Sequence, residues 1–130
     1  MHSSIDLLLS RIKAGLPVDF NDTQQVIKQY YQYHPVCFTN GPESDQLINE
    51  AGTNEGSCRI FYFARLHGLN ESETLHLFGA FYREDVMVHP EGQNHPNIRQ
   101  FMKYGWGGIH YQEGSHPCLV LRTNPLVAEA

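Results

Sequence analysis

Four side chains in the second half of the chain could bind a metal ion or move a proton. Asp85 and His89 are four residues apart, so on a helix both side chains lie on one face and can reach the same atom. A carboxylate and an imidazole in that arrangement can act as a general-base pair or as two ligands of a metal ion. Glu91 and His95 follow closely and could add two further ligands. The catalytic and the metal hypotheses therefore share Asp85 and His89.

Asp85 also has a structural interpretation, which we favour. On a helix over residues 71–88, Asp85 falls in the middle of the apolar half. An unpaired carboxylate there would be costly or would become protonated, so we expect Asp85 to have a partner. In the structural hypothesis the partner is the set of backbone amides in the glycine-rich loop 52–56. In the functional hypothesis Asp85 works with His89.

Cys58 is a further catalytic candidate, because it lies in the first turn of a predicted helix. The helix dipole and the free amides of that turn favour a thiolate. The letters GSC before an aromatic helix are also similar, over a few residues, to the surroundings of the nucleophile in papain-like proteases. We prefer a core position for Cys58, since free cysteine is among the most buried residue types.

Polar residues at the entrance of the same helix could bind a small ligand. The segment 49–58, NEAGTNEGSC, and a second polar stretch over 81–99 are each unusually dense in chemical groups, and we expect them to come together. The candidate ligand-binding residues are Asn49, Glu50, Asn54, Glu55 and Trp106. The structural alternative is that the amides and carboxylates cap turns or the helix, and that the tryptophan packs in the core.

The elements that position these residues are predicted from apolar spacing and from helix start and stop signals. Five helices are expected, over about 5–16, 21–33, 54–67, 71–88 and 96–105. Strands are expected at 35–39, 46–49 and 109–111, and residues 118–122 form a fourth strand or an ordered tail. Asn40-Gly41 is expected to start the turn of a hairpin between the first two strands. The helix at 54–67 is so apolar that it must lie at the centre. We predict an α+β fold with about five helices around a central apolar helix and a small antiparallel sheet.

Composition limits the classes of protein and partner. The chain has 130 residues, 41% of them hydrophobic and 18% charged, which fits one folded domain. The net charge of −5 and the scattered Lys and Arg residues provide no basic patch, so neither nucleic acid nor a membrane is an expected partner. Three cysteines outside any zinc pattern indicate reduced thiols in a soluble, cytoplasmic protein. The N-terminal segment has neither a basic leader nor a continuous apolar run, so no cleaved secretory signal is expected.

Several segments together resemble the HopJ type III effector protein family. The matching segments are FTNG from Phe38, NEAGTNEGSC from Asn49, FYREDV from Phe81, HPEG from His89 and NIRQFMKYGWGGI from Asn97. They occur in order from about residue 38 to residue 109, so we treat 1–130 as a single HopJ-like domain whose tail, 113–130, lies outside the match. The resemblance implies a small bacterial α+β protein. It brings no established reaction, cofactor or catalytic residue.

Two classes of function follow from these observations. In the first, which we favour, the chain is a HopJ-type protein of undefined molecular activity, acting as a type III secretion effector or as an interaction protein. Its partner would then be another protein, a host target if the chain is exported without a cleaved signal. In the second, the chain is a small metal- or metabolite-binding protein or enzyme with a site around Asp85 and His89. The sequence identifies no cofactor and no oligomeric state.

Overall fold

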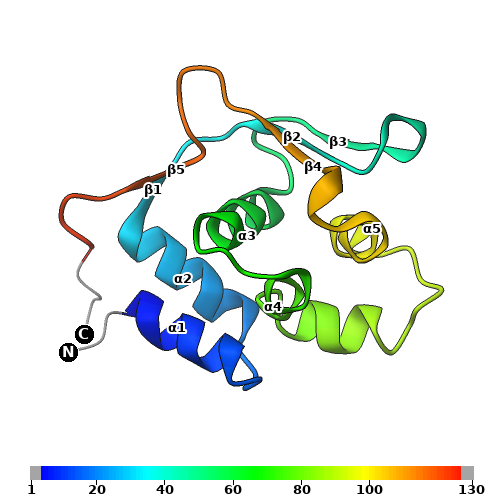
Figure 1. Cartoon of the computed structure of the whole chain (residues 1–130), viewed down its shortest axis with the longest axis horizontal. Helices are drawn as coiled ribbons and strands as arrows, with labels where there is room; N and C mark the ends of the chain where they lie inside the picture. The colour runs from blue at the N-terminus through cyan, green and yellow to red at the C-terminus, as the bar shows by residue number, and fades with distance from the viewer. Residues whose placement is uncertain (1–3, 127–130) are drawn as a thin grey trace.

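The apolar periodicities of the sequence produce five α-helices and one π-helix among residues 4–126, the part of the chain described by the computed structural model (Figure 1). The helices are α1 (Ser4–Lys13), α2 (Phe20–Tyr30), α3 (Glu55–Leu66), α4 (Glu71–His76), the π-helix η2 (Phe81–Val86) and α5 (Pro96–Tyr104). Short 3-10 turns occur at η1 (Glu43–Asp45) and η3 (Gly105–Gly108). The strands are β1 (Tyr31–Tyr33), β2 (Cys37–Asn40), β3 (Leu47–Asn49), β4 (Ile109–Gln112) and β5 (Leu119–Leu121). The predicted α+β class is confirmed.

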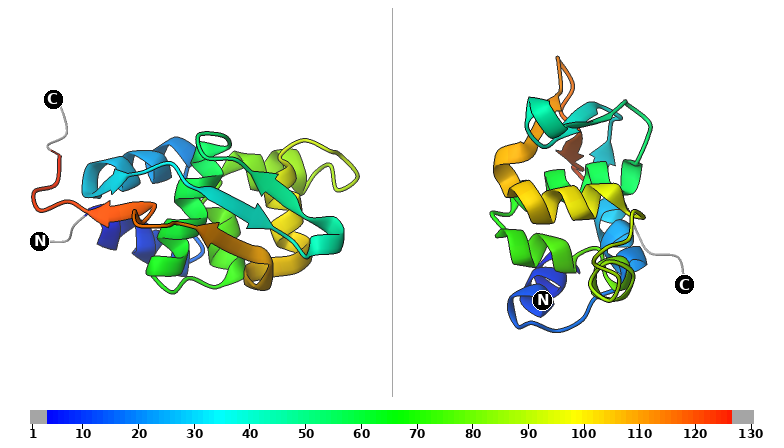
Figure 2. Two further views of the ribbon diagram at one scale, coloured as in Figure 1. Left: turned by 90° about the horizontal axis from the view of Figure 1, so that it is seen from above. Right: turned by 90° about the vertical axis from the view of Figure 1, so that its right-hand side faces the viewer.

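The strands form two small antiparallel sheets that lie on one side of the helices (Figures 1 and 2). The larger sheet has the order β3-β2-β4, with Phe38 of β2 opposite Asn49 of β3 and Tyr111 of β4. The predicted hairpin between β2 and β3 is therefore confirmed. The second sheet pairs β1 with β5, so residues 118–122 contain a strand.

The second predicted helix is shorter than expected. Helix α2 ends at Tyr30, and the next three residues are extended and pair with β5. The prediction that this helix continues to residue 33 is wrong, because a strand near the other end of the chain supplies hydrogen-bonding partners for residues 31–33.

Helix α3 occupies the centre of the molecule, as predicted (Figure 1). Its Ile60, Phe61, Phe63 and Ala64 side chains have no exposed surface. The Phe61 ring contacts aromatic rings from four other segments, namely Phe38, Phe78, Phe101 and Trp106. Burial of these rings against one helix joins the sheet to α5 and to the segment after α4.

The predicted fourth helix over 71–88 is broken in two, so that prediction is wrong. Helix α4 ends at His76, Gly79 has a left-handed backbone with φ of +63°, and the chain then forms η2. A Cβ atom on Gly79 would lie 2.7 Å from the backbone nitrogen of Phe20, so glycine permits a close approach that any other residue would prevent. Because of the break, the side chains of η2 do not point in the directions that an unbroken helix over 71–88 would give them. Asp85 is consequently 46% exposed and does not lie on an apolar face.

Candidate functional site

Asp85 forms its side-chain contact with His95, ten residues away. The Asp85 Oδ2 atom lies 2.9 Å from the His95 Nε2 atom, and the two side chains are 46% and 28% exposed. Within residues 4–126 no hydrogen bond joins the Asp85 side chain to the loop 52–56, so the expected contact with those backbone amides does not form. The expectation of a buried carboxylate is wrong because it assumed an unbroken helix.

The other members of the predicted metal group lie apart from this pair. His89 and Glu91 are exposed, and the His89 carbonyl accepts a hydrogen bond of 2.9 Å from Arg99. Arg99 also donates to Asn94 and so holds the loop before α5 in a folded form. Residues 4–126 contain no group of three or more His, Cys, Asp or Glu side chains arranged to hold a metal ion.

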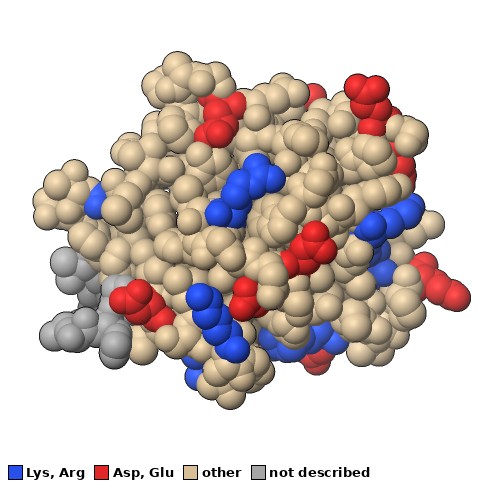
Figure 3. All heavy atoms as spheres, in the orientation of Figure 1, with Lys and Arg blue, Asp and Glu red and all other residues tan. Residues whose placement is uncertain are grey.

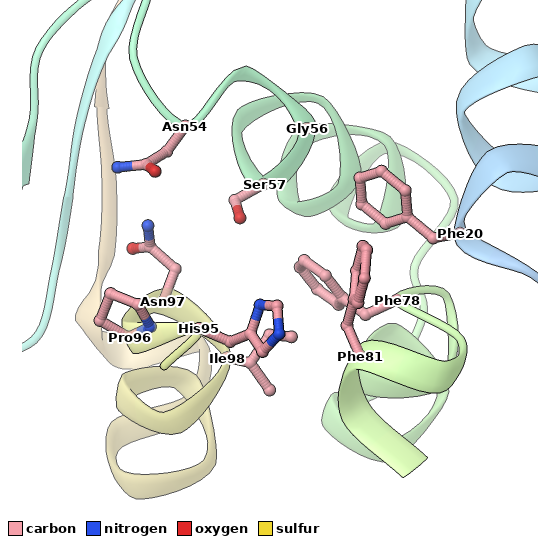
Figure 4. A pocket seen from close by; sticks show the side chains of 10 residues that line it. All are labelled: Phe20, Asn54, Gly56, Ser57, Phe78, Phe81, His95, Pro96, Asn97 and Ile98. Atoms are coloured by element: carbon pink, nitrogen blue, oxygen red, sulfur yellow. The ribbon is translucent and has the colours of Figure 1, made fainter. Parts of the chain in front are cut away.

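A pocket of about 250 Å³ opens beside the Asp85–His95 pair (Figure 4). It lies between the N-terminal ends of α3 and α5, the start of α2 and the segment that leads into η2. The lining residues are Phe20, Asn54, Gly56, Ser57, Phe78, Phe81, His95, Pro96, Asn97 and Ile98. The expectation that the two polar stretches of the sequence come together is confirmed here. Of the predicted ligand-binding residues, Asn54 lines this pocket.

Two lining residues have an uncommon backbone conformation. Asn54 precedes α3 with φ of +49°, and His95 precedes α5 with φ of +52°. A left-handed backbone is rare outside glycine, and it costs of order 1–3 kcal/mol when the surrounding structure imposes it. They are the two non-glycine residues with positive φ in the part of the chain that the structure describes. Both line the same pocket.

Three buried asparagines, of which Asn97 also lines the pocket, hold the parts of the pocket together. Asn40, Asn49 and Asn97 are 0–4% exposed and come from β2, β3 and α5. The Asn97 Oδ1 atom accepts from Asn40 and Asn49, both at 3.1 Å, and the Asn97 amide nitrogen donates to Asn49 at 2.8 Å. The Asn54 amide nitrogen also donates to the Asn49 Oδ1 atom at 2.8 Å. This asparagine cluster fixes the starts of α3 and α5 relative to the sheet.

Asn49 was predicted as a ligand-binding residue, and the structure places it inside the asparagine cluster, 3% exposed. Glu50 is exposed, and neither Glu50 nor Glu55 lines the pocket. Trp106 packs against Phe101 with ring centroids 5.0 Å apart and donates from its indole nitrogen to the Leu69 carbonyl at 3.1 Å. These four residues therefore lie outside the pocket.

The pocket has an aromatic wall that the sequence did not identify as part of a site. The rings of Phe20 and Phe81 have centroids 4.9 Å apart, and Phe81 stacks on His95 at 4.8 Å with an interplanar angle of 27°. Phe78 completes the wall at 6.4 Å from Phe20. Phe78 and Phe81 also share the apolar half of the predicted 71–88 helix, since residues three apart lie on one face. In the structure they lie on either side of the break at Gly79 and both line the pocket.

The opposite side of the pocket is polar. Figure 4 shows the Ser57 hydroxyl directed into the pocket from the first turn of α3, with the His95 ring facing it from the start of α5. The Ser57 hydroxyl makes no hydrogen bond with any of residues 4–126. Because Ser57 and His95 are not hydrogen-bonded, the Asp85–His95 pair does not extend to a serine. The chemistry that this arrangement supports directly is recognition of a small molecule by hydrogen bonds and ring contacts.

Cys58 faces away from the pocket and into the core. It is 1% exposed, its sulfur lies 3.6 Å from the sulfur of Cys118, and its thiol lies 3.8 Å from the Val36 carbonyl. The hydrogen bond with Cys58, with burial adding to it, raises the pKa of Cys118, so this thiol stays protonated. The position of Cys58 is that of a core residue.

Comparison with known proteins places this architecture in a family. A family model described as HopJ type III effector protein matches residues 5–115. The chain is also similar to a crystal structure described as that of an unknown function protein, VPA0580, with 40% sequence identity and a TM-score of 0.82. That similarity covers 94% of this chain and 97% of the other. The comparison with curated proteins gives no match. Among residues 4–126, no helix is both long enough and apolar enough to cross a membrane.

Proposed function

Because the chain belongs to the HopJ type III effector protein family, we propose that it is a type III secretion effector that acts by binding another protein in the recipient cell. The observation that carries the proposal is the family match, which extends over residues 5–115 and so includes every helix except the first residue of α1. The protein would be made in the bacterial cytoplasm and exported without removal of a signal.

The state of the cysteines is compatible with export. A chain that passes through a secretion channel in an extended form must have no covalent cross-link between distant segments. Cys37, Cys58 and Cys118 are all free thiols. Cys58 and Cys118 are 60 residues apart, so a disulfide between them would keep a large loop closed during export. Reduced thiols, which the bacterial cytoplasm maintains, leave the chain free to unfold.

The charge distribution supports a protein partner. Figure 3 shows one face of the molecule on which basic and acidic side chains are scattered among uncharged residues. The net charge is −5. A partner rich in phosphate groups would require a concentrated basic surface. The scattered charges on this face form no such concentrated basic surface, so a protein partner is favoured over a phosphate-rich one.

A secretion assay tests the export part of the proposal. An epitope-tagged full chain is expressed in a bacterium with a working type III apparatus and in an otherwise identical strain that lacks the secretion ATPase. We expect the tagged chain in the medium of the first strain and in the cells of the second, with a cytoplasmic marker retained in both. Equal amounts of the chain in both media, or none in either while a known effector is secreted, would contradict the proposal.

Photo-crosslinking tests the partner-binding part. Among residues 4–126, the most exposed large apolar side chains are Ile48 at 61%, Leu121 at 63% and Val88 at 64%, and they lie on β3, β5 and the segment after η2. A photoreactive amino acid at each position, in turn, samples three separate surfaces of the delivered protein. We expect a discrete adduct from at least one position and none from a matched position in the core. No adduct from any of the three would argue against a stable protein partner.

A further inference from the structure

We propose that a second pocket, between α2, β1 and the residue that follows β5, binds the phosphate group of a small soluble phosphate monoester. This basic pocket is lined by Lys28, Arg59 and Arg122. The inference goes beyond the proposed effector function and does not depend on export. It rests on three basic side chains that pair with no carboxylate of the described residues, and on the way in which the fold holds two of them.

The fold brings these three basic residues together from distant parts of the sequence. Lys28 lies on α2, Arg59 lies on α3, and Arg122 directly follows β5. The pairing of β1 with β5 places Arg122 beside the end of α2, where the Arg122 main-chain nitrogen donates to the Tyr30 carbonyl at 2.8 Å (Figure 1). The scattered positions of Lys and Arg in the sequence therefore do not reveal the cluster.

Among the residues that the structure describes, those that line the basic pocket carry positive charge and no negative charge. The other lining residues are Gln24, Gln25, Ile27, Tyr31 and Tyr33. Within residues 4–126 none of the three basic side chains forms an ion pair, although the whole chain has a net charge of −5. Glu55 lies one turn before Arg59 on α3, but it does not line the pocket. An anion in the pocket is therefore attracted by all three basic groups.

The two arginines are held in place while most of their hydrogen-bond donors stay unused. The Arg59 guanidinium donates to the Gln24 Oε1 atom at 3.3 Å and lies 4.2 Å from the centre of the Tyr33 ring. The Arg122 Nε atom donates to the Lys28 carbonyl at 3.2 Å. A guanidinium has five N–H donors, so each arginine keeps most of them for a ligand. Gln24 and Lys28 are four residues apart on α2, so the two anchoring points lie about 6 Å apart along the helix.

The neutral polar groups of the basic pocket do not oppose an anion. The Gln24 amide uses both its oxygen and its nitrogen in hydrogen bonds to α3. The Tyr31 hydroxyl is hydrogen-bonded to the His67 ring at 2.8 Å, and the Tyr33 hydroxyl is buried. The Gln25 side chain is exposed and its amide nitrogen can donate to an anion. The arginines therefore remain the main donors of the site.

Charge and shape favour a phosphate group over a single carboxylate. A phosphate monoester carries a charge of about −1.5 to −2 at pH 7 and has three terminal oxygens that accept hydrogen bonds. These oxygens point in different directions, so one phosphate group can accept pairs of hydrogen bonds from Arg59 and from Arg122, which come from different elements. A carboxylate carries one charge and has two oxygens in one plane, so a single guanidinium engages both.

The volume of the basic pocket fits a phosphate group with a short carbon body. A water molecule occupies about 30 Å³ in the liquid, so a pocket of about 290 Å³ holds the equivalent of roughly ten waters. A nucleic acid or an anionic membrane presents many phosphate groups and requires an extended basic surface, whereas one phosphate group requires one pocket. A small molecule, and not a phosphate-rich polymer, is therefore the expected ligand.

Titration of the isotope-labelled full chain with glycerol 3-phosphate, followed by two-dimensional NMR, tests the proposal. At pH 7 the second phosphate ionisation, of pKa about 6, is largely complete, and the ionic strength is kept constant. We expect saturable shifts of the Arg59 and Arg122 Nε signals and of nearby amides, with a dissociation constant on the order of 1 mM because so small a ligand has few atoms to bind with. Glycerate, a matched single carboxylate, should bind at least about tenfold more weakly. Equal binding of glycerate would overturn the choice of a phosphate group.

Three variants make the result specific to the basic pocket. Arg122→Gln should weaken the binding of glycerol 3-phosphate at least about tenfold, because charge-assisted hydrogen bonds are lost. Lys28→Gln, at an exposed position where the fold tolerates the change, should weaken it about threefold. Arg11→Gln is the matched control and should leave binding unchanged, because Arg11 also donates to one main-chain carbonyl, that of Pro17 at 2.8 Å, but lies outside the pocket. Absence of saturable shifts, shifts that map elsewhere, or equal binding by Arg122→Gln and Arg11→Gln would each overturn the proposal.

Vesicles distinguish a soluble ligand from a lipid. Phosphatidic acid presents the same phosphate monoester as glycerol 3-phosphate, but on a membrane surface. We expect no sedimentation of the chain with phosphatidylcholine vesicles that contain phosphatidic acid, because the net charge of −5 opposes approach to an anionic surface. Binding to these vesicles without binding of soluble glycerol 3-phosphate would overturn the proposal.

Discussion

Replacement of Asn97 by alanine removes three hydrogen bonds from the buried asparagine cluster, and their cost can be worked out from the remaining contacts. Each partner atom keeps a second hydrogen bond. The Asn40 amide still donates to the Asn97 main-chain oxygen, the Asn49 amide still donates to the Phe38 carbonyl, and the Asn49 oxygen still accepts from Asn54. The Asn40 Oδ1 atom has no hydrogen-bond partner within the described residues before the change, and the change leaves no further buried group there without one. Three bonds at about 1 kcal/mol each then give a loss of about 3 kcal/mol.

Asn49→Ala should lower the free energy of unfolding by more than Asn97→Ala does, although each variant loses one amide side chain. The Asn49 side chain takes part in four hydrogen bonds, with Phe38, Asn54 and twice with Asn97. Its loss also leaves the Asn97 amide nitrogen, which has no other acceptor among residues 4–126, buried and unpaired. Four bonds at about 1 kcal/mol and a further penalty of about 1–3 kcal/mol give roughly 5–7 kcal/mol.

Urea unfolding measures both losses, with the fluorescence of Trp106 as the signal, since it is the one tryptophan and packs against Phe101 in the folded state. Asn21→Ala, at an exposed position of α2, is the matched control and should change the free energy of unfolding by less than about 0.5 kcal/mol. The dependence of that free energy on urea concentration should be the same in all variants. Equal stabilities of the two cluster variants, or a greater loss for Asn97→Ala, would refute the reasoning.

Three further predictions concern stability. Gly79→Ala should lower the free energy of unfolding by at least about 2 kcal/mol, because its Cβ atom would sit on a left-handed backbone and 2.7 Å from a backbone nitrogen. The control Gly107→Ala should cost much less, because its Cβ atom would meet nothing within 4 Å. Equal urea midpoints of the two variants would contradict this prediction. Oxidation by diamide should join Cys58 to Cys118 in a disulfide and so remove two thiols from a thiol titration. Because this bond closes a loop of 60 residues, it should raise the free energy of unfolding by up to about 4 kcal/mol. No rise in the urea midpoint would contradict this prediction. Burial lowers the pKa of His67 in the folded chain. The contribution of His67 to stability is therefore complete above its usual pKa of 6.5, and it is lost as the pH falls from there through the lowered pKa. A pH series of urea midpoints should show this loss in the native chain and not in His67→Gln.

The sequence predicts those parts of the fold that depend on local signals. The apolar residues of α3, the Asn40-Gly41 turn of the hairpin and the Gly105 end of α5 were all identified, and each is determined by residues close in the chain. The break after α4 was missed because it depends on the backbone near Phe20, more than fifty residues earlier. The strand β1 was missed for the same reason, since its partner β5 follows some ninety residues later.

The sequence predicts where the candidate site lies more accurately than it predicts which residues form it. The sequence indicated that 49–58 and 81–99 meet, and the pocket forms between them. Helical spacing continued through Gly79 places Asp85 and Phe81 on a buried face, so it does not show that they lie at a pocket. The direction of the Ser57 hydroxyl depends on where the starts of α2 and α5 lie relative to α3, which the spacing within α3 does not determine. The asparagine cluster joins residues up to 57 positions apart, a relation that one sequence does not reveal.

Delivery into a recipient cell is the central claim, and a translocation reporter measures it most directly. The full chain is fused to the N-terminus of an adenylate cyclase that is active only with host calmodulin, and cyclic AMP is measured in host cells after contact with the bacteria. The account predicts a rise in cyclic AMP with the strain that has a working type III apparatus and no rise with the strain that lacks the secretion ATPase. No rise with either strain, while a known effector fusion gives one, would contradict the account.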